Sequence, residues 1–277
     1  MSGRYLFSLD LEDPRDALAG GERHPARVPP LTEAFLAFLR RHDGRGTFFT
    51  VGSVARRHPE LLRAIAAAGH EIGCHSDAHL RLHQQDPRGF RDDLRRNLDA
   101  IDAAVAVPVR GYRAPCFSLT RNTRWAYEIL AELGFTYSSS VLPARNPIGG
   151  WPGFGPAPRM IDGIIELPVT LLPWPRVPMG GVYFRALPRA LLRRGLSACL
   201  RRGQPVLAYH HPYDIDTAQG FAHPDFARWS PPGLLMRMGR AQLLARLEMA
   251  AQLGFRFEAY DRYAQEAPHG ARSGPEE

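Results

Sequence analysis

The sequence predicts an α/β fold, a single distorted (β/α) barrel with about seven or eight parallel strands. Two observations support this prediction. Short apolar runs alternate along most of the chain with segments whose apolar residues recur at helical spacing. A length of 277 residues with 44% hydrophobic residues is enough for one large barrel with a substantial core.

The individual elements follow from apolar spacing, glycine stops and cap residues. Strands are expected at 5–9, 46–51, 70–74, 109–113, 135–138, 164–167, 205–209 and 255–259. Helices are expected at 31–42, 59–68, 90–101, 122–133, 188–202 and 240–253, with Thr32 and Asn122 as amino-terminal caps of the first and fourth. With neither an internal repeat nor a linker in view, we expect one domain, 1–266, followed by a disordered tail, 267–277.

Composition and charge narrow the class of protein. The formal net charge of +7 comes mostly from arginine pairs at helical positions, which indicates solvated helix faces and no nucleic-acid site, since no basic stripe with interleaved aromatics is present. No apolar run is long enough to span a membrane. The amino terminus enters a strand without a secretory apolar region, and the 3 cysteines are odd in number. We therefore expect a cytoplasmic protein, either free in the cytoplasm or at the inner face of the membrane. The sequence does not predict its oligomeric state.

His75 and His79 are the most informative residues. They lie four positions apart, directly after a predicted strand. On a helical turn, residues at this spacing share one face, so both imidazoles can reach one metal ion. The end of a strand is also where α/β enzymes hold their catalytic groups. The pair predicts a metal site if a carboxylate joins it.

Asp10, Glu12 and Asp13 supply that carboxylate. They follow the first predicted strand, where an acid must face a polar site or lie in the next loop. One carboxylate and two imidazoles suit Zn²⁺ or another divalent ion with positions left open. A second carboxylate nearby can then act as a base on water.

The order of the motifs completes this interpretation. Five of them occur in sequence: Ser8–Asp13, Gly46–Phe49, Gly69–His79, Gly111–Ser118 and Tyr209–Asp216, with the segments Glu166–Pro168 and Gly180–Arg185 in between. Over most of its length the chain resembles a polysaccharide deacetylase of the NodB-homology group, carbohydrate esterase family 4. It is most similar to the branch found in exopolysaccharide and lipopolysaccharide gene clusters. The resemblance implies a barrel of the NodB-homology type.

The resemblance also assigns roles to residues. It implies that Asp10 is the general base, that Glu12 or Asp13 joins His75 and His79 as metal ligand, and that Arg113 orients the base. The metal is most often Zn²⁺, with Co²⁺, Mn²⁺ and Ni²⁺ as alternatives. The general acid falls on His211, with His210 as the adjacent competitor.

Other positions concern the substrate. The resemblance places a backbone N–H near Cys116 at the developing oxyanion, with Cys116 itself as a wall residue. Trp174, Tyr183 and Trp229 are candidates for stacking on a sugar. Two loops rich in proline and glycine, 143–158 and 217–232, are long enough to act as lids. The segment 135–140 lacks the acid that relatives place before their paired serines, which puts the rate or the pH optimum in question.

The resulting hypothesis is a metal-dependent hydrolase that removes an acetyl or formyl group from an amino sugar during polysaccharide or glycolipid biosynthesis. The expected substrate is a small amido sugar or a lipid-linked or nucleotide-linked sugar. Two alternatives stay open: a hydrolase of a small cyclic amide or ureide on the same barrel, and a carbohydrate-binding relative without catalysis.

Overall fold

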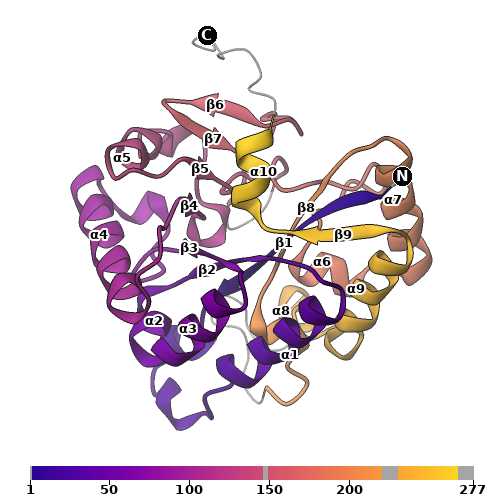
Figure 1. The fold of residues 1–277 in the computed structure, drawn as a ribbon, viewed down its shortest axis with the longest axis horizontal. Helices are drawn as coiled ribbons and strands as arrows, with labels where there is room; N and C mark the ends of the chain where they lie inside the picture. Colours follow the sequence, from indigo (N-terminus) through magenta and orange to yellow (C-terminus); the bar gives the residue numbers. More distant parts are fainter. Residues whose placement is uncertain (1, 146–148, 220–229, 268–277) are drawn as a thin grey trace.

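The structure is a computed structural model that describes residues 2–145, 149–219 and 230–267. Its centre is a 9-stranded sheet in the order β6-β7-β5-β4-β3-β2-β1-β8, with β9 paired to β1 (Figure 1). The strands are β1 (Gly3–Leu11), β2 (Thr47–Thr50), β3 (Glu71–Cys74), β4 (Gly111–Tyr112), β5 (Tyr137–Ser138), β6 (Arg159–Ile161), β7 (Ile164–Glu166), β8 (Val206–His210) and β9 (Phe255–Glu258).

Every pairing in this sheet is parallel except that of β6 with β7. The central strand is β1. Its residues Tyr5–Leu9 pair with β8, and on its other edge Gly3–Leu6 pair with β9 and Ser8–Leu11 with β2. The carboxyl ends of β8, β1 and β2 therefore lie side by side, and the loops that follow them meet at one end of the sheet.

An irregular segment links β7 to β8. The Thr170 N–H donates to the Leu207 carbonyl, and the Leu207 N–H donates to the Thr170 hydroxyl. Further along, Gly180 forms a parallel bridge with Tyr209. These contacts bring the segment that follows β7 against β8 without a regular strand between the two strands. The result is a distorted barrel of mostly parallel strands, as the sequence predicts.

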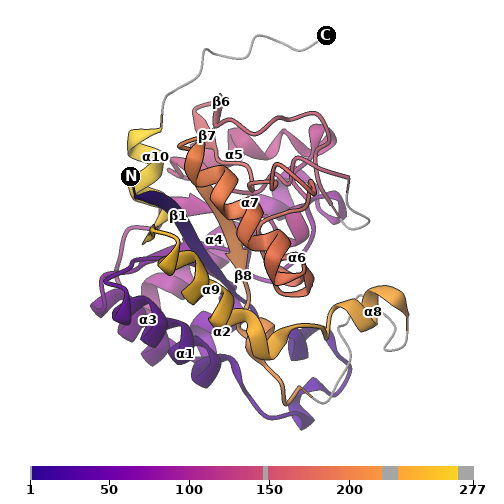
Figure 2. The ribbon, with the colours of Figure 1, turned by 90° about the vertical axis from the view of Figure 1, so that its right-hand side faces the viewer.

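Helices surround the sheet (Figures 1 and 2). They are α1 (Val28–Arg41), α2 (Gly52–Arg57), α3 (Pro59–Ala67), α4 (Pro87–Ala104), α5 (Ala126–Glu132), α6 (Gly181–Ala186), α7 (Arg189–Arg201), α8 (Pro231–Leu235), α9 (Leu243–Gln252) and α10 (Tyr260–Glu266). The short helix α8 stands away from the body of the protein in Figure 2. None of the helices in the described ranges has the length and apolar character needed to cross a bilayer.

The two predicted helix caps are wrong. Helix α1 begins at Val28, because Pro29 and Pro30 fit its first turn, and the Thr32 hydroxyl donates to the Val28 carbonyl from inside the helix. Asn122 lies in a separate 3₁₀ turn, and α5 begins only at Ala126.

The predicted carboxyl-terminal boundary falls at the end of α10. Ala267 follows this helix and is 4% exposed, so the ordered chain includes it. The rest of the predicted tail, 268–277, lies outside the described residues.

Candidate active site

The predicted catalytic residues come from four strands of the sheet. Asp10 is near the end of β1, His75 directly follows β3, Arg113 follows β4 and His211 follows β8. All four strands run parallel, so their carboxyl ends open onto the same face of the barrel. The topology therefore brings together residues that are up to two hundred positions apart in the sequence.

Asp10 and Arg113 form a buried ion pair. The Arg113 guanidinium is 0% exposed and donates from Nη1 to Asp10 Oδ1 at 2.8 Å. Nη1 also donates to the Ser8 hydroxyl, whereas Nε and Nη2 donate to the Ser139 carbonyl and hydroxyl. The guanidinium plane also lies 4.3 Å from the centroid of the Phe49 ring. A cation held this firmly fixes the position of the Asp10 carboxylate.

Glu12, His75 and His79 form a cluster suited to a metal ion. One ligand atom from each lies within 4.8 Å of the other two. His75 donates from Nδ1 to the Arg113 carbonyl at 2.8 Å, which leaves its Nε2 lone pair for a metal. The Glu12 carboxylate lies 2.5 Å from His79 Nε2 and 3.8 Å from His75 Nε2. One carboxylate and two imidazoles are a donor set that Zn²⁺ accepts.

The electrostatics of Glu12 agree with a ligand role. Burial raises the pKa of the Glu12 carboxyl, but the His79 charge and hydrogen bonds from both imidazoles outweigh it and hold that pKa well below its ordinary value. Tyr213 donates a hydrogen bond to the other carboxylate oxygen at 3.1 Å. Glu12 is therefore ionised across the neutral pH range.

The two histidines do not lie on a helical turn, so that part of the prediction is wrong. The chain between them is irregular, and Ser76 and His79 have positive φ values of 69° and 54°. The rings nevertheless come within 5.0 Å, centroid to centroid. Loop geometry, rather than helical periodicity, brings the imidazoles together.

Helix α4 holds this loop in place. The buried Asp93 carboxylate accepts hydrogen bonds from the Asp77 and Ala78 N–H groups at 2.9 and 3.1 Å. The Asn97 side chain donates to the Ser76 carbonyl at 2.7 Å and to the Thr50 carbonyl at 3.0 Å. Sequence reasoning missed both residues. Their signal was a pair of polar residues on the apolar face of a helix, at Asp93 and Asn97.

Asp13, the alternative to Glu12 as metal ligand, faces a different partner. Its carboxylate accepts bonds from the Arg15 guanidinium, the closest at 2.5 Å, and from the Arg15 N–H. It caps the 3₁₀ turn Pro14–Ala17. Glu12 reaches the histidines and Asp13 does not.

His211 and His210 lie in different surroundings. His211 Nε2 lies 3.9 Å from Asp10 Oδ2 and 3.8 Å from Glu12 Oε1, on the face that carries the cluster. His210 is buried among aromatic rings and its Nε2 contacts the Tyr5 hydroxyl at 3.1 Å. Burial lowers the pKa of His210 to about 4, so it stays neutral. Strand alternation thus sends one imidazole to the site and the other into the core.

Asp214 supplies the acid that appeared to be missing. Its Oδ2 lies 3.0 Å from His211 Nδ1 and accepts the His211 N–H at 2.9 Å. Burial lowers the pKa of His211, but the Asp214 charge and hydrogen bond outweigh it and raise that pKa to about 9. Arg185, 0% exposed, donates to Asp214 Oδ1 at 2.7 Å. The absence of an acid in 135–140 is therefore compensated from the loop after β8.

The predicted substrate positions are spread out. Cys116 has a positive φ of 55° and lines a hollow of about 710 Å³ together with Glu12 and His79. Tyr183 is half-buried in α6, and Trp174 is 63% exposed in the segment between β7 and α6. Trp229 lies outside the described residues. Only Cys116 of these lines the hollow beside the metal cluster.

Two family models match successive parts of the chain. Residues 22–138 match the family model described as polysaccharide deacetylase, and residues 139–262 match that of a domain of unknown function (DUF3473). The amino-terminal region of the chain is therefore similar to the polysaccharide deacetylase family. The two matches meet directly after β5 (Tyr137–Ser138), in the middle of one continuous sheet.

Curated relatives match only part of the chain. A chitooligosaccharide deacetylase of Bradyrhizobium is 35% identical over 89 residues, which is 31% of this chain and 40% of that protein. A peptidoglycan deacetylase of Helicobacter pylori is 26% identical over 139 residues, 50% of this chain and 45% of that protein. The matched part spans less than half the length of each.

Solved structures share the fold over nearly the whole chain. A putative polysaccharide deacetylase from Mycobacterium smegmatis superposes with a TM-score of 0.67 at 23% identity, covering 100% of this chain and 95% of that one. A family 4 carbohydrate esterase from Streptomyces lividans gives 0.50 at 17% identity, covering 92% and 91%. At these identities the comparison concerns the fold alone, and it confirms the barrel.

Proposed function

We propose that this chain is a divalent-metal-dependent hydrolase that removes an acetyl or formyl group from the nitrogen of an amino sugar. The observation that carries the proposal is the meeting of three groups at one end of the barrel. These are the Glu12, His75 and His79 cluster, the Asp10–Arg113 pair and the His211–Asp214 pair. Together they offer metal ligands, a base and an acid within reach of one another.

Glu12, His75 and His79 would hold the metal. The lone pair of His75 Nε2 and the ionised Glu12 carboxylate fit a divalent cation, and Zn²⁺ suits this mixture of nitrogen and oxygen donors best. When bound, such an ion lowers the pKa of water and polarises the acyl carbonyl.

Asp10 would act as the base. Arg113 occupies its Oδ1, so Oδ2 is the oxygen that faces the site, 3.9 Å from His211 Nε2. From there Oδ2 accepts a proton from the water that attacks the acyl carbon. The resulting charge on the acyl oxygen would lie near the backbone around Cys116, which lines the same hollow.

His211 would act as the acid. Asp214 holds its Nδ1–H, so Nε2 carries the transferable proton toward Asp10 and Glu12. As the C–N bond breaks, Nε2 donates that proton to the leaving nitrogen, which departs as an amine. A pKa near 9 keeps His211 protonated at neutral pH, as an acid requires.

We further propose that the substrate is a small, lipid-linked or nucleotide-linked amido sugar in polysaccharide or glycolipid biosynthesis. The hollow beside Glu12 has room for one or two sugar units. We expect a higher kcat/KM on such substrates than on long N-acetylglucosamine oligomers. The reverse ranking across a panel of both would reject this substrate class. The cytoplasmic location stays a prediction from the sequence.

Metal analysis and an acyl-release assay test the proposal together. Purified protein should hold close to one divalent ion per chain, and His75→Ala combined with His79→Ala should remove both the ion and the release of acetate or formate. Full metal occupancy in this double variant would contradict the ligand assignment. Ring opening of cyclic amides or ureides, without release of acetate or formate from amido sugars, favours the first alternative, and sugar binding without hydrolysis favours the second.

A further inference from the structure

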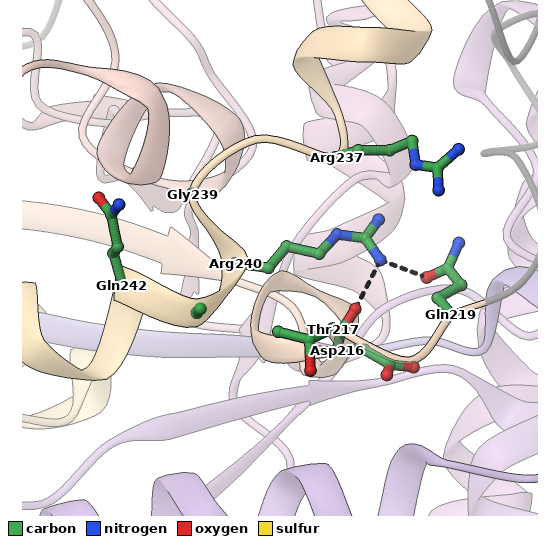
Figure 3. A pocket seen from close by; sticks show the side chains of 8 residues that line it. Asp216, Thr217, Gln219, Arg237, Gly239, Arg240 and Gln242 are labelled. Atoms are coloured by element: carbon green, nitrogen blue, oxygen red, sulfur yellow. Dashed lines mark hydrogen bonds between the residues drawn. The ribbon is translucent and has the colours of Figure 1, made fainter.

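A second polar pocket lies beyond the catalytic residues, next to the loop that follows β8. It has a volume of about 300 Å³ and is shown in Figure 3. Its lining residues are Asp216, Thr217, Gln219, Arg237, Gly239, Arg240, Ala241 and Gln242. None of them takes part in the chemistry described above.

Arg240 forms the buried wall of this pocket. The residue is 8% exposed, and its Nη1 donates to the Asp216 carbonyl at 2.9 Å and to Gln219 Oε1 at 3.1 Å. Its Nε and Nη2 donate to the Met236 carbonyl at 3.3 and 3.2 Å. The guanidinium thus ties the loop after β8 to the segment after α8. It gives the pocket a fixed shape with a buried positive charge.

Arg237 is the cationic side chain of the pocket that an anion can reach. Its side chain is exposed and makes no ion pair with any residue in the described part of the chain. Figure 3 shows the Arg237 guanidinium on the same side of the pocket as the Arg240 guanidinium and the Gln219 amide. An anion between these groups would receive charged hydrogen bonds from at least one free guanidinium.

The net charge of the pocket is positive. Asp216 is its one acidic residue among those described, and its Oδ2 is paired with Arg27 at 2.7 Å while its Oδ1 accepts the Ala218 N–H. Burial, followed by the nearby charge of Arg185, lowers the pKa of Arg240. A bound anion would relieve this repulsion between guanidinium groups.

The pocket is a neighbour of the catalytic centre. A crevice of about 20 Å³ is lined by Glu12, Tyr213, Asp216 and Gln219, among other residues. Asp216 and Gln219 also line the pocket around Arg237, and Glu12 belongs to the metal cluster. Shared lining residues thus place the pocket beside the catalytic centre, where the phosphate of a ligand bound at the metal cluster would lie.

We propose that the pocket around Arg237 and Arg240 binds the phosphate or diphosphate group that joins an amido sugar to its carrier. This inference rests on the proposed function and specifies its substrate class. The carrier can be a nucleoside or a lipid, since both offer the same phosphate chemistry. The exposed side chains of Leu234, Leu235 and Met238 in the same segment give a lipid chain an apolar surface.

The test compares substrates with and without the phosphate. We measure kcat/KM for two linked substrates, an N-acetyl amino sugar on a nucleoside diphosphate and one on a prenyl diphosphate. Each value is divided by the kcat/KM for the neutral N-acetyl amino sugar, which gives one ratio per carrier. Arg237→Ala should lower this ratio about tenfold or more, mainly through KM, because it removes a charged phosphate contact. Arg237→Lys should restore part of it. The matched control is Arg194→Ala, an exposed arginine on α7, and it should leave the ratio unchanged.

A binding measurement separates this inference from the proposed function. Inorganic pyrophosphate is titrated calorimetrically into the wild-type protein and into Arg237→Ala. It should bind the wild-type protein at least about tenfold more tightly than the variant. Equal affinities, or an unchanged substrate ratio in Arg237→Ala, would overturn the phosphate site. Absence of any acyl release alongside Arg237-dependent pyrophosphate binding would instead overturn the proposed function and leave the site in place. The carrier is identified by which of the two linked substrates loses more.

Discussion

Two buried arginine–aspartate pairs border the candidate active site. Arg113 contacts Asp10 at 2.8 Å and Arg185 contacts Asp214 at 2.7 Å. Both arginines are fully buried, so burial and pairing alone do not distinguish the two pairs.

The second carboxylate oxygen distinguishes them. In Asp10 it faces the site, 3.9 Å from His211 Nε2. In Asp214 it is occupied by the ring and the backbone N–H of His211. The first carboxylate can receive a proton from a substrate water, whereas the second can only orient an imidazole. The contact made by the second carboxylate oxygen therefore determines the function of each pair.

Asp10→Asn should have the largest effect of the variants that probe this contrast. The amide keeps the shape but cannot accept the proton, so kcat should fall by about a thousandfold or more. Metal content, measured on the same preparation, should stay near one ion per chain. Asp13→Asn is the matched control, because Asp13 pairs with Arg15 outside the cluster. Activity of Asp10→Asn within tenfold of the parent would remove Asp10 from the role of base.

The second test concerns the acid. His211→Ala should lower amide hydrolysis by about a hundredfold or more, because the amine must leave with a proton. Hydrolysis of an aryl acetate should fall much less, since an aryl oxide leaves without one. His210→Ala should lower thermal stability by opening a cavity in the aromatic core. A larger loss of amide turnover in His210→Ala than in His211→Ala would move the assignment by one residue.

Asp214→Asn should have a smaller effect on turnover. The carboxylate orients His211 and does not touch the substrate, and loss of such a partner costs about tenfold to a hundredfold in activity. The loss should be confined to kcat for amides, with aryl acetates nearly unaffected. A drop as large as that of Asp10→Asn would show that the two aspartates share one role.

The last contrast sets these pairs against Glu71, a half-buried carboxylate that pairs with no cation among the residues described. It accepts bonds from Thr47, Tyr137 and the Asp261 N–H. Burial, followed by repulsion from Asp261, raises its pKa to about 7. Its contribution to folding is therefore complete below about pH 4.5 and is lost as the pH rises through 7.

Urea unfolding at pH 5 and pH 8 measures this contribution. The wild-type protein should lose on the order of 3 kcal/mol more unfolding free energy between these pH values than Glu71→Gln does. Comparing the two pH slopes cancels the other titrating groups. Equal slopes would mean that Glu71 is ionised throughout.

Much of the fold could be predicted from the sequence, because alternating apolar patterns and glycine stops report secondary structure directly. The predicted helix caps failed for a local reason. The two prolines at the start of α1 fit its first turn better than Thr32 fits a cap, and side-chain rules alone do not rank these options.

The candidate site could be predicted only in part. Spacing indicated His75 and His79, and the family resemblance indicated Asp10 and Arg113, but neither could choose between Glu12 and Asp13. That choice depends on Arg15, whose guanidinium takes the Asp13 carboxylate. Likewise, Asp93, Asn97 and Arg185 act from distant elements, and no local pattern relates a polar residue on a helix face to the loop it will support.

The irregular link between β7 and β8 has an evolutionary consequence. The register of β8 is set by five consecutive pairs with β1, so it does not depend on the length of the chain between Thr170 and Gly180. Insertions and deletions in that interval can accumulate without shifting His211 relative to Asp10. The segment between Thr170 and Gly180 is thus a place where related proteins can differ in length while Asp10 and His211 keep their relative positions.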